Sequence, residues 1–272
     1  MSENITVLVT GASGTLGSAA VPRLEKQGYA VRPMTRSSRA GWVTADLRTG
    51  EGLADAVRGV DVIVHLASSP GRPGRTDVAG TRLLLSAAKE AGVKHVLYLS
   101  IIGIDRVPYR YYRAKLATEE VVKASGIPYT ILRAAQFHDF VAIILSAAGK
   151  LGPVIIDPSW RLQPVAIEDV ANRIAELIGR PAPDIPRPAP EIARPVPGIV
   201  RPGTGETVEY AGPEVFTLDD LARTWLAARG RDRIWRLRLP GGLARAFREG
   251  ATTTTATPTG SRTWRDYLAA KY

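Results

Sequence analysis

Residues 7–17 read Val-Leu-Val-Thr-Gly-Ala-Ser-Gly-Thr-Leu-Gly, an apolar run followed by three regularly spaced glycines. The run predicts a buried strand over residues 5–10, and the periodicity beyond the glycines predicts a helix over 15–27. Such glycines allow a tight turn, a close backbone approach to a ligand and close packing of helix on strand. The helix N-terminus adds free N–H groups and a positive dipole end. The stretch therefore predicts a cradle for a dinucleotide pyrophosphate. Its residues are Gly11, Ser13, Gly14, Thr15, Leu16 and Gly17.

Outward from this stretch, short apolar runs alternate with helical patterns as far as residue 134. Further strands are expected over residues 29–35, 42–45, 61–66, 93–100 and 128–132, and helices over 53–57, 77–91 and 111–124. Continuous apolar strands alternating with helices predict an α/β fold, a Rossmann doubly wound parallel sheet. Right-handed crossovers place the carboxyl ends of all its strands, and the ligand, at one edge.

The alternation stops after residue 134, which suggests a division of the chain. We expect residues 1–134 to form the NAD(P)-binding core and residues 135–272 a smaller C-terminal region that caps the substrate. Helices are expected in this second region near residues 137–148, 167–177, 217–228 and 261–270, with a seventh strand over 206–211.

Residues 180–203 stand apart because they are rich in proline and arginine and repeat with a seven-residue period. Eight prolines between residues 181 and 202 forbid a helix and favour an extended surface insert. Such an insert is either a duplicated loop without function or an arm that contacts another subunit.

Composition limits the classes of function. The chain of 272 residues has no cysteine, which excludes disulfides, thiolate metal sites and cysteine nucleophiles, and its three histidines lack metal-ligand spacing, so no metal is expected. Only seven of the 36 basic residues behind the net charge of +10 are lysines, and the arginines are scattered, so we expect no nucleic-acid partner. The start of the chain lacks signal-peptide features, and no apolar run approaches the roughly 18 residues that span a bilayer. We therefore expect a cytoplasmic monomer or homo-oligomer that acts on a small molecule without a membrane partner.

The end of the second strand bears on the choice between NAD and NADP. An acidic residue there would bind the ribose 2′-hydroxyl of NAD, but this chain has Arg36, which can pair with the 2′-phosphate of NADP. NADP(H) is therefore favoured, with NAD also possible if Arg36 only faces solvent. The remainder of the groove is expected from Asp46 and Leu47 near the adenine and from Leu66, Ala67 and Ser68 near the ribose.

Several motifs in order resemble the NmrA-like group of atypical short-chain dehydrogenase/reductases, over nearly the whole chain apart from the proline insert. These are Val-Thr-Gly-Ala-Ser-Gly-Thr-Leu-Gly (9–17), His-Leu-Ala (65–67), Gly-Thr (80–81), Leu-Ser-Ile-Ile-Gly (99–103), Tyr-Arg-Ala-Lys-Leu (112–116), Leu-Arg-Ala-Ala-Gln-Phe-His (132–138) and Gln-Pro-Val-Ala-Ile-Glu-Asp-Val (163–170). The resemblance implies a Rossmann fold that binds NADP(H), with a smaller C-terminal substrate region.

The resemblance also implies a reaction centre. Ser100 ends the fifth strand, and Tyr111 and Lys115 share a helix face at a spacing of four residues. In the wider family such a tyrosine gives a proton to the substrate oxygen, the lysine lowers its pKa and binds the nicotinamide ribose, and the serine orients the carbonyl. Tyr112 is three residues from Lys115, so which tyrosine faces the pocket stays open. By the same resemblance the substrate is expected against Gln136, Phe137 and His138, where His138 serves as an acid or base or only as a structural hydrogen-bonding group.

Two functions follow from these residues. The first is an NADPH-dependent oxidoreductase acting on a small aromatic, quinone or enone-type substrate, with a polyketide tailoring step coupled to hydroxylation as a special form. The second is a non-catalytic redox sensor that binds NAD(P) and regulates a partner, as NmrA-like regulators do. An isomerase or epimerase shares the motif, but no long sugar-nucleotide domain is visible in the sequence.

Overall fold

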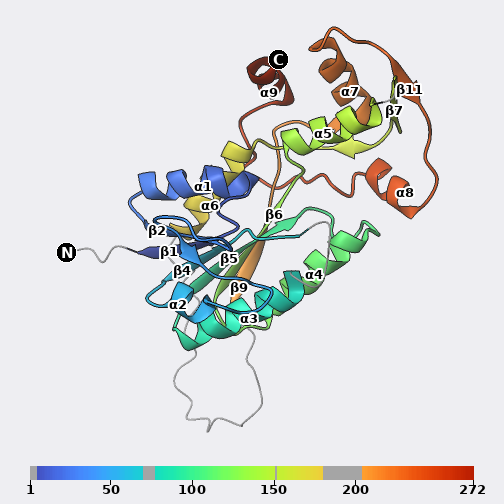
Figure 1. Ribbon diagram of the computed structural model, residues 1–272. Coiled ribbons are helices and arrows are strands. Elements are labelled where there is room, and N and C mark those ends of the chain that lie inside the picture. Colours follow the sequence, from blue (N-terminus) through green and yellow to red (C-terminus); the bar gives the residue numbers. More distant parts are fainter. Residues whose placement is uncertain (1–4, 70–76, 151, 180–203) are drawn as a thin grey trace.

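Seven parallel strands form the central sheet, in the order β3-β2-β1-β4-β5-β6-β9. The computed structural model describes residues 5–69, 77–150, 152–179 and 204–272 (Figure 1). The sheet strands are β1 (Thr6–Thr10), β2 (Ala30–Thr35), β3 (Val43–Thr44), β4 (Val62–His65), β5 (His95–Ile101), β6 (Tyr129–Ala134) and β9 (Gly205–Tyr210). The predicted Rossmann sheet is confirmed, including a last strand that returns from the second half of the chain.

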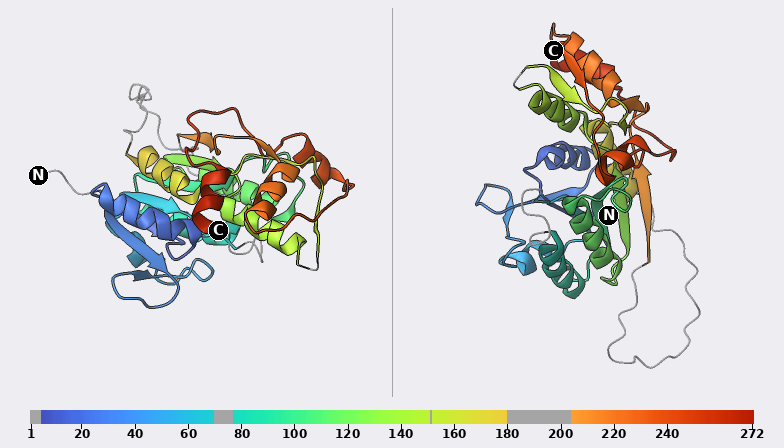
Figure 2. Two further views of the ribbon diagram at one scale, coloured as in Figure 1. Left: turned by 90° about the horizontal axis from the view of Figure 1, so that it is seen from above. Right: turned by 90° about the vertical axis from the view of Figure 1, so that its right-hand side faces the viewer.

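Helices cover both faces of this sheet, which explains why its strands are continuously apolar. One face carries α1 (Thr15–Lys26) and α6 (Ile167–Ile178), which pack against each other and share one hydrophobic core. The other face carries α2 (Leu53–Val57), α3 (Asp77–Glu90) and α4 (Arg110–Lys123) over a second core. Figures 1 and 2 show these two helical layers on either side of the strands.

The strand order reverses at β1, which pairs with β2 on one side and β4 on the other. In a doubly wound sheet this switch point opens a crevice at the carboxyl ends of the strands, where ligands bind. The turn from β1 into α1, the loop after β4 and the ends of β5 and β6 all meet this edge.

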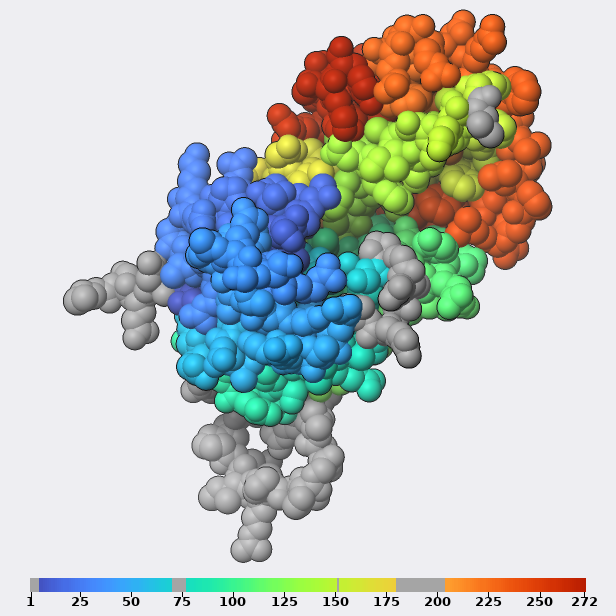
Figure 3. All heavy atoms as spheres, in the orientation of Figure 1, coloured from blue at the N-terminus to red at the C-terminus, as the bar shows by residue number. Residues whose placement is uncertain are grey.

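The remaining elements gather into a layer beyond the carboxyl edge of the sheet, at the upper right of Figure 1 and of the space-filling view in Figure 3. They pack around a core that includes the fully buried rings of Trp225 and Trp264. They are α5 (His138–Ala148), β7 (Val154–Ile156), β8 (Arg161–Leu162), β10 (Phe216–Thr217), α7 (Leu218–Ala227), β11 (Ile234–Arg236), α8 (Gly242–Arg248) and α9 (Trp264–Lys271).

The four helices predicted after residue 134 appear as α5, α6, α7 and α9 with shifts at their ends, while β7, β8, β10, β11 and α8 were not predicted. Strands of two or three residues carry no detectable period-two pattern, so only tertiary pairing reveals them. The proline-rich insert and its arm hypothesis lie outside the described residues. Within the described part of the chain, no helix is both long and apolar enough to cross a bilayer.

Candidate cofactor and substrate site

The glycine turn after β1 is shaped by close backbone approaches. Gly11 has a φ of +67°, and a Cβ there would lie 2.7 Å from the backbone nitrogen of Ala67. A Cβ on Gly17 would collide with the carbonyl oxygen of Gly11. Both positions therefore require glycine. Gly11 lets the turn pack against the backbone of the loop after β4, and Gly17 lets α1 pack against the turn itself.

Gly14 is the N-cap of α1, and no side chain caps that helix end. Ser13, Gly14 and Thr15 are exposed there, while Leu16 is buried below them. Free N–H groups at the start of a 12-residue helix, on a turn that admits no side chain, fit the pyrophosphate of a dinucleotide.

The residues at the end of β2 and β3 are strongly basic. Arg36 is exposed, and Arg39 stacks over the ring of Trp42 at 4.0 Å. Asp46, expected near the adenine, forms an ion pair of 2.7 Å with Arg48, and this pair lowers the pKa of its carboxyl. Leu47 is buried, and its carbonyl lies 2.8 Å from where a Cβ on Gly80 would be.

A chain of hydrogen bonds fixes the loop after β4 to the end of β1. The backbone N–H of Ala67 donates to Thr10 Oγ1 at 3.3 Å, and this hydroxyl lies 2.7 Å from Nδ1 of His65. Nε2 of His65 lies 2.9 Å from the hydroxyl of Thr81, which itself donates to the Asp77 carbonyl. Burial lowers the pKa of His65 to about 3, so its ring is neutral at physiological pH and serves this hydrogen-bond chain.

Lys115 lies beneath this edge with 3% of its surface exposed. Its ammonium donates to the Leu99 carbonyl and sits 4.3 Å from the centre of the Tyr98 ring. Burial lowers its pKa to about 8, while the carboxylates of Asp77 and Glu119 oppose that shift. A buried cation with few protein acceptors is suited to bind hydroxyl groups of a ligand that enters above it.

The two tyrosines of α4 point to different partners. The hydroxyl of Tyr111 lies 2.7 Å from that of Ser68, whereas Tyr112 is buried and accepts a hydrogen bond of 3.2 Å from Gln136 Nε2. Burial raises the pKa of both phenols, and the Ser68 bond lowers that of Tyr111 in part. Tyr111 is thus half-buried beside the loop that borders the glycine cradle, and Tyr112 supports the loop after β6.

Ser100 faces α4 from inside the sheet. Its hydroxyl donates to Glu119 Oε1, and Arg133 holds the same carboxylate through Nε at 2.9 Å and Nη2 at 2.8 Å. This network is buried at Ser100 and Glu119. The structure therefore brings Tyr111, Ser68 and Lys115 to one edge but gives the Ser100 hydroxyl a partner on α4.

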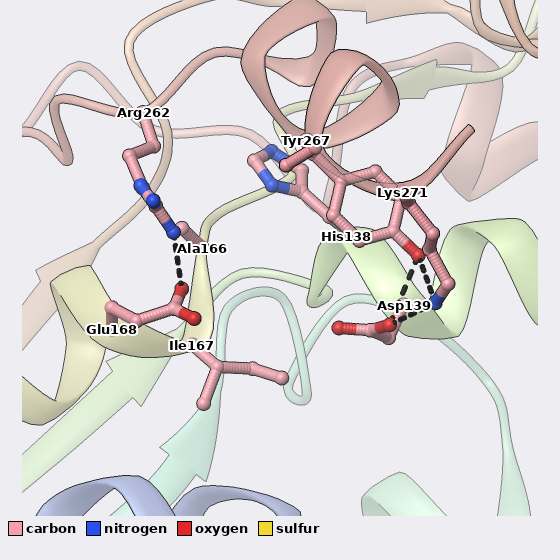
Figure 4. Close-up of a pocket in the computed structure, with 9 residues that line it drawn as sticks. His138, Asp139, Ala166, Ile167, Glu168, Arg262, Tyr267 and Lys271 are labelled. Atoms are coloured by element: carbon pink, nitrogen blue, oxygen red, sulfur yellow. Dashed lines mark hydrogen bonds and ion pairs between the residues drawn. The ribbon is translucent and has the colours of Figure 1, made fainter. Parts of the chain in front are cut away.

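His138 turns away from the tyrosines toward α9. Its ring lies beside the stacked rings of Trp264 and Tyr267, at centroid distances of 5.7 and 5.3 Å. It also borders a cavity of about 250 Å³ (Figure 4). Burial lowers its pKa to about 4, although the Pro164 carbonyl opposes this shift. Phe137 packs with the α1 and α6 core. The cavity is lined by His138, Asp139, Ala166, Ile167, Glu168, Arg262, Tyr267, Ala270 and Lys271.

Sequence reasoning missed two carboxylates that act on Lys115. Asp77 begins α3 and leaves one buried carboxylate oxygen without a partner among the described residues, and Glu119 follows Lys115 by one helical turn. The spacing of Lys115 and Glu119 was a signal that could have been used. The described residues contain no cluster that could hold a metal ion.

The switch-point crevice, the side-chain-free glycine turn and the uncapped start of α1 define a nucleotide-binding Rossmann protein. A sequence model described as NAD(P)H-binding matches residues 11–181, and the chain belongs to that family. Its cofactor is therefore NAD(P)H.

Curated relatives match only parts of the chain. Photosystem II assembly factor Ycf39 of Cyanophora paradoxa is 32% identical over an alignment of 149 residues that covers 49% of this chain and 46% of that protein. Sterol demethylase protein B of Methylococcus capsulatus is 30% identical over 187 residues, covering 59% and 54%. The chain thus spans about half the length of these two relatives.

Solved structures match almost the entire chain. The NADPH-bound quinone oxidoreductase QOR2 of Escherichia coli has a TM-score of 0.73 and 21% identity, covering 97% of this chain and 99% of that one. The triphenylmethane reductase of Citrobacter sp. has a TM-score of 0.71 and 20% identity, covering 93% and 92%. These likenesses establish the fold, a Rossmann-like α/β architecture shared with NAD(P)-binding reductases and epimerases.

Proposed function

We propose that the protein is an NADPH-dependent oxidoreductase that reduces a small aromatic, quinone or enone-type substrate. The observation that carries this proposal is the placement of the Tyr111 hydroxyl beside Ser68, with Lys115 buried on the same helix at the cofactor edge. The fold shared with a quinone oxidoreductase supports the choice of substrate class.

In this proposal the chain's own residues bind the cofactor, exclude water and deliver one proton. The turn of Gly11, Gly14 and Gly17 would hold the pyrophosphate, and Arg36 would pair with the 2′-phosphate of NADPH. Lys115 would bind the nicotinamide ribose. The reduced nicotinamide supplies a hydride when bound.

Tyr111 would give its phenolic proton to the substrate oxygen as the hydride reaches the substrate. One hydride and one proton convert a ketone to an alcohol or a quinone to a hydroquinone. Burial raises the pKa of Tyr111 above its usual 10, so the phenol carries its proton at neutral pH. Gln136 and Phe137, after β6, would contact the substrate. His138 would contact it from the neighbouring cavity beside α9.

Steady-state oxidation of NADPH with a panel of quinones, enones and aromatic ketones tests this function. The proposal expects turnover with at least one class, and a lower rate with NADH. Oxygen uptake in the same assays would support the narrower form, in which reduction is coupled to hydroxylation of an aromatic polyketide. Tight NADP(H) binding without turnover on any member of the panel would contradict the reductase.

The second proposal, a non-catalytic NAD(P)-binding sensor, is favoured by one observation. The Lys115 ammonium bonds to the Leu99 carbonyl, and the Ser100 hydroxyl bonds to Glu119, so neither group contacts Tyr111. A sensor needs the cradle but no assembled proton donor. It predicts a conformational change between NADP⁺ and NADPH, visible as different proteolysis patterns, in a protein that turns over no substrate.

A further inference from the structure

A two-stranded ribbon on the outer side of the C-terminal layer has one buried face and one exposed face that is also apolar. β11 pairs in parallel with β7, with Trp235 beside Ile155. The pairing extends beyond the strand ends, because Val154 N–H donates to the Arg233 carbonyl and Leu237 N–H to that of Ile156. Side chains alternate along such a ribbon, so Arg233, Trp235 and Leu237 share the face on which Ile155 lies.

That outer face is apolar yet open to solvent. Trp235 is 63% exposed, Leu237 is 55% exposed and Ile155 is 47% exposed. The opposite face is buried in the core of the C-terminal layer through Val154 and Ile156. Because neighbouring residues of both strands contribute, the exposed apolar side chains form a contiguous group rather than scattered single residues.

The chain around this face is strongly cationic. Residues 229–248 contain seven arginines and a single acidic residue, Asp232. Arg236 forms an ion pair with Asp219 on the inner side of the ribbon, and Arg248 forms one with Asp157. Arg233 and Arg238 are exposed and form no ion pair with the described residues. Unpaired guanidinium groups therefore flank the exposed tryptophan and leucine on both sides along the chain.

We propose that this ribbon face, made of Ile155, Arg233, Trp235 and Leu237 and followed along the chain by the exposed Arg238, docks the protein on the surface of an anionic lipid membrane. Tryptophan favours the headgroup level of a bilayer, where its ring is partly buried, and leucine and isoleucine gain by entering the acyl boundary. Arginines beside them meet the phosphates and the negative surface potential. Such surface attachment needs no membrane-spanning helix, and it departs from the expectation, drawn from the sequence alone, that the protein has no membrane partner.

The charge of the chain argues against a second copy as the occupant, since two faces with unpaired arginines and a net charge of +10 on each chain repel each other. An acidic protein is the other anionic occupant. The membrane is favoured because exposed apolar side chains and unpaired arginines lie together on one ribbon. This combination suits a continuous anionic interface and needs no matching set of carboxylates.

Co-sedimentation of the full chain with vesicles tests the proposal and is independent of any reductase activity. Phosphatidylcholine vesicles with about 30% phosphatidylserine are compared with pure phosphatidylcholine vesicles at low and high salt. We expect binding to the anionic vesicles only, weakened by salt. The tryptophan emission should shift to the blue on binding, and this shift should vanish in Trp235→Ala.

Matched variants separate this face from general basicity. Arg233→Glu should weaken binding to anionic vesicles at least about fivefold, whereas Arg82→Glu on α3 makes the same charge change elsewhere and should weaken it much less. Leu237→Ala should likewise weaken binding, with Leu83→Ala, another exposed leucine, as its control. The proposal is overturned if the wild-type protein does not bind anionic vesicles or binds only an acidic protein. It is also overturned if the ribbon variants and the α3 variants lose binding equally.

Discussion

The hydroxyl oxygens of Ser68 and Tyr111 lie 2.7 Å apart, although 43 residues separate them in the chain. The bond connects the loop after β4 to the first turn of α4, at the edge where the cofactor cradle opens. It makes Ser68 the protein partner of the phenol that we propose as proton donor.

Ser68→Ala should move the pH profile of the reductase toward higher pH. The Ser68 bond lowers the pKa of Tyr111, so its loss raises that pKa. A proton donor must be protonated, and activity falls as pH rises through its pKa, so the alkaline limb of kcat should shift upward. Ser69→Ala is the control, because only the backbone N–H of Ser69 bonds to Asp77. An unchanged alkaline limb in Ser68→Ala would show that Ser68 does not affect the pKa of the proton donor.

Lys115→Met should weaken NADPH binding by about tenfold or more, as expected when a charge-assisted hydrogen bond is lost. The fold should keep its stability, because burial already lowers the pKa of Lys115 to about 8 and methionine leaves no cation to desolvate. Titration of cofactor fluorescence and thermal unfolding measure the two effects. Unchanged NADPH affinity would remove Lys115 from the cofactor site.

Arg36→Glu should reverse part of the preference for NADPH over NADH. A carboxylate at this position repels a 2′-phosphate and can accept a hydrogen bond from a free 2′-hydroxyl, so the ratio of the two dissociation constants should change about tenfold or more. The same charge change at Arg82 on α3 should leave the ratio intact. Equal ratios in the wild type and Arg36→Glu would show that the arginine only faces solvent.

Folding stability should fall as the solution is acidified below about pH 6.5. Burial lowers the pKa of His65 to about 3 and of His138 to about 4. Between these values and pH 6.5, both histidines are protonated in the unfolded chain and neutral in the folded chain. The stability that each histidine contributes is complete above its unfolded pKa and is lost as the pH falls toward its folded pKa. Between pH 7 and 5 the free energy of unfolding should drop by about 2 kcal/mol per histidine. Urea unfolding at both pH values measures it. His138→Phe should flatten the slope, and an unaltered slope would mean that His138 ionises normally.

The Rossmann sheet could be predicted from the sequence because its signals are local. The apolar run before Gly11, the three glycines and the helical periodicity after Thr15 lie within one continuous segment. Even the returning strand β9 had a readable pattern beyond the insert. In contrast, β7 and β11 are three residues each and exist only because they pair with each other.

The candidate site could be predicted only by position along the strands. Tyr111 and Tyr112 are adjacent on α4, and helical spacing to Lys115 admits both; their partners, Ser68 and Gln136, come from distant loops. Likewise Gln136 and His138 follow the same strand, yet one reaches Tyr112 and the other reaches α9. Such directions depend on tertiary packing, which no spacing rule contains.

Single-turnover reduction in the complex with NADPH and an accepted quinone or ketone tests the central claim most directly. Tyr111→Phe removes the proton donor and keeps the ring, so the rate of NADPH consumption should fall by about a hundredfold or more while NADPH affinity stays near that of the wild type. Tyr109→Phe, which alters an exposed ring next to it, is the control and should keep the rate. A Tyr111→Phe variant that reduces the substrate as fast as the wild type would contradict the account.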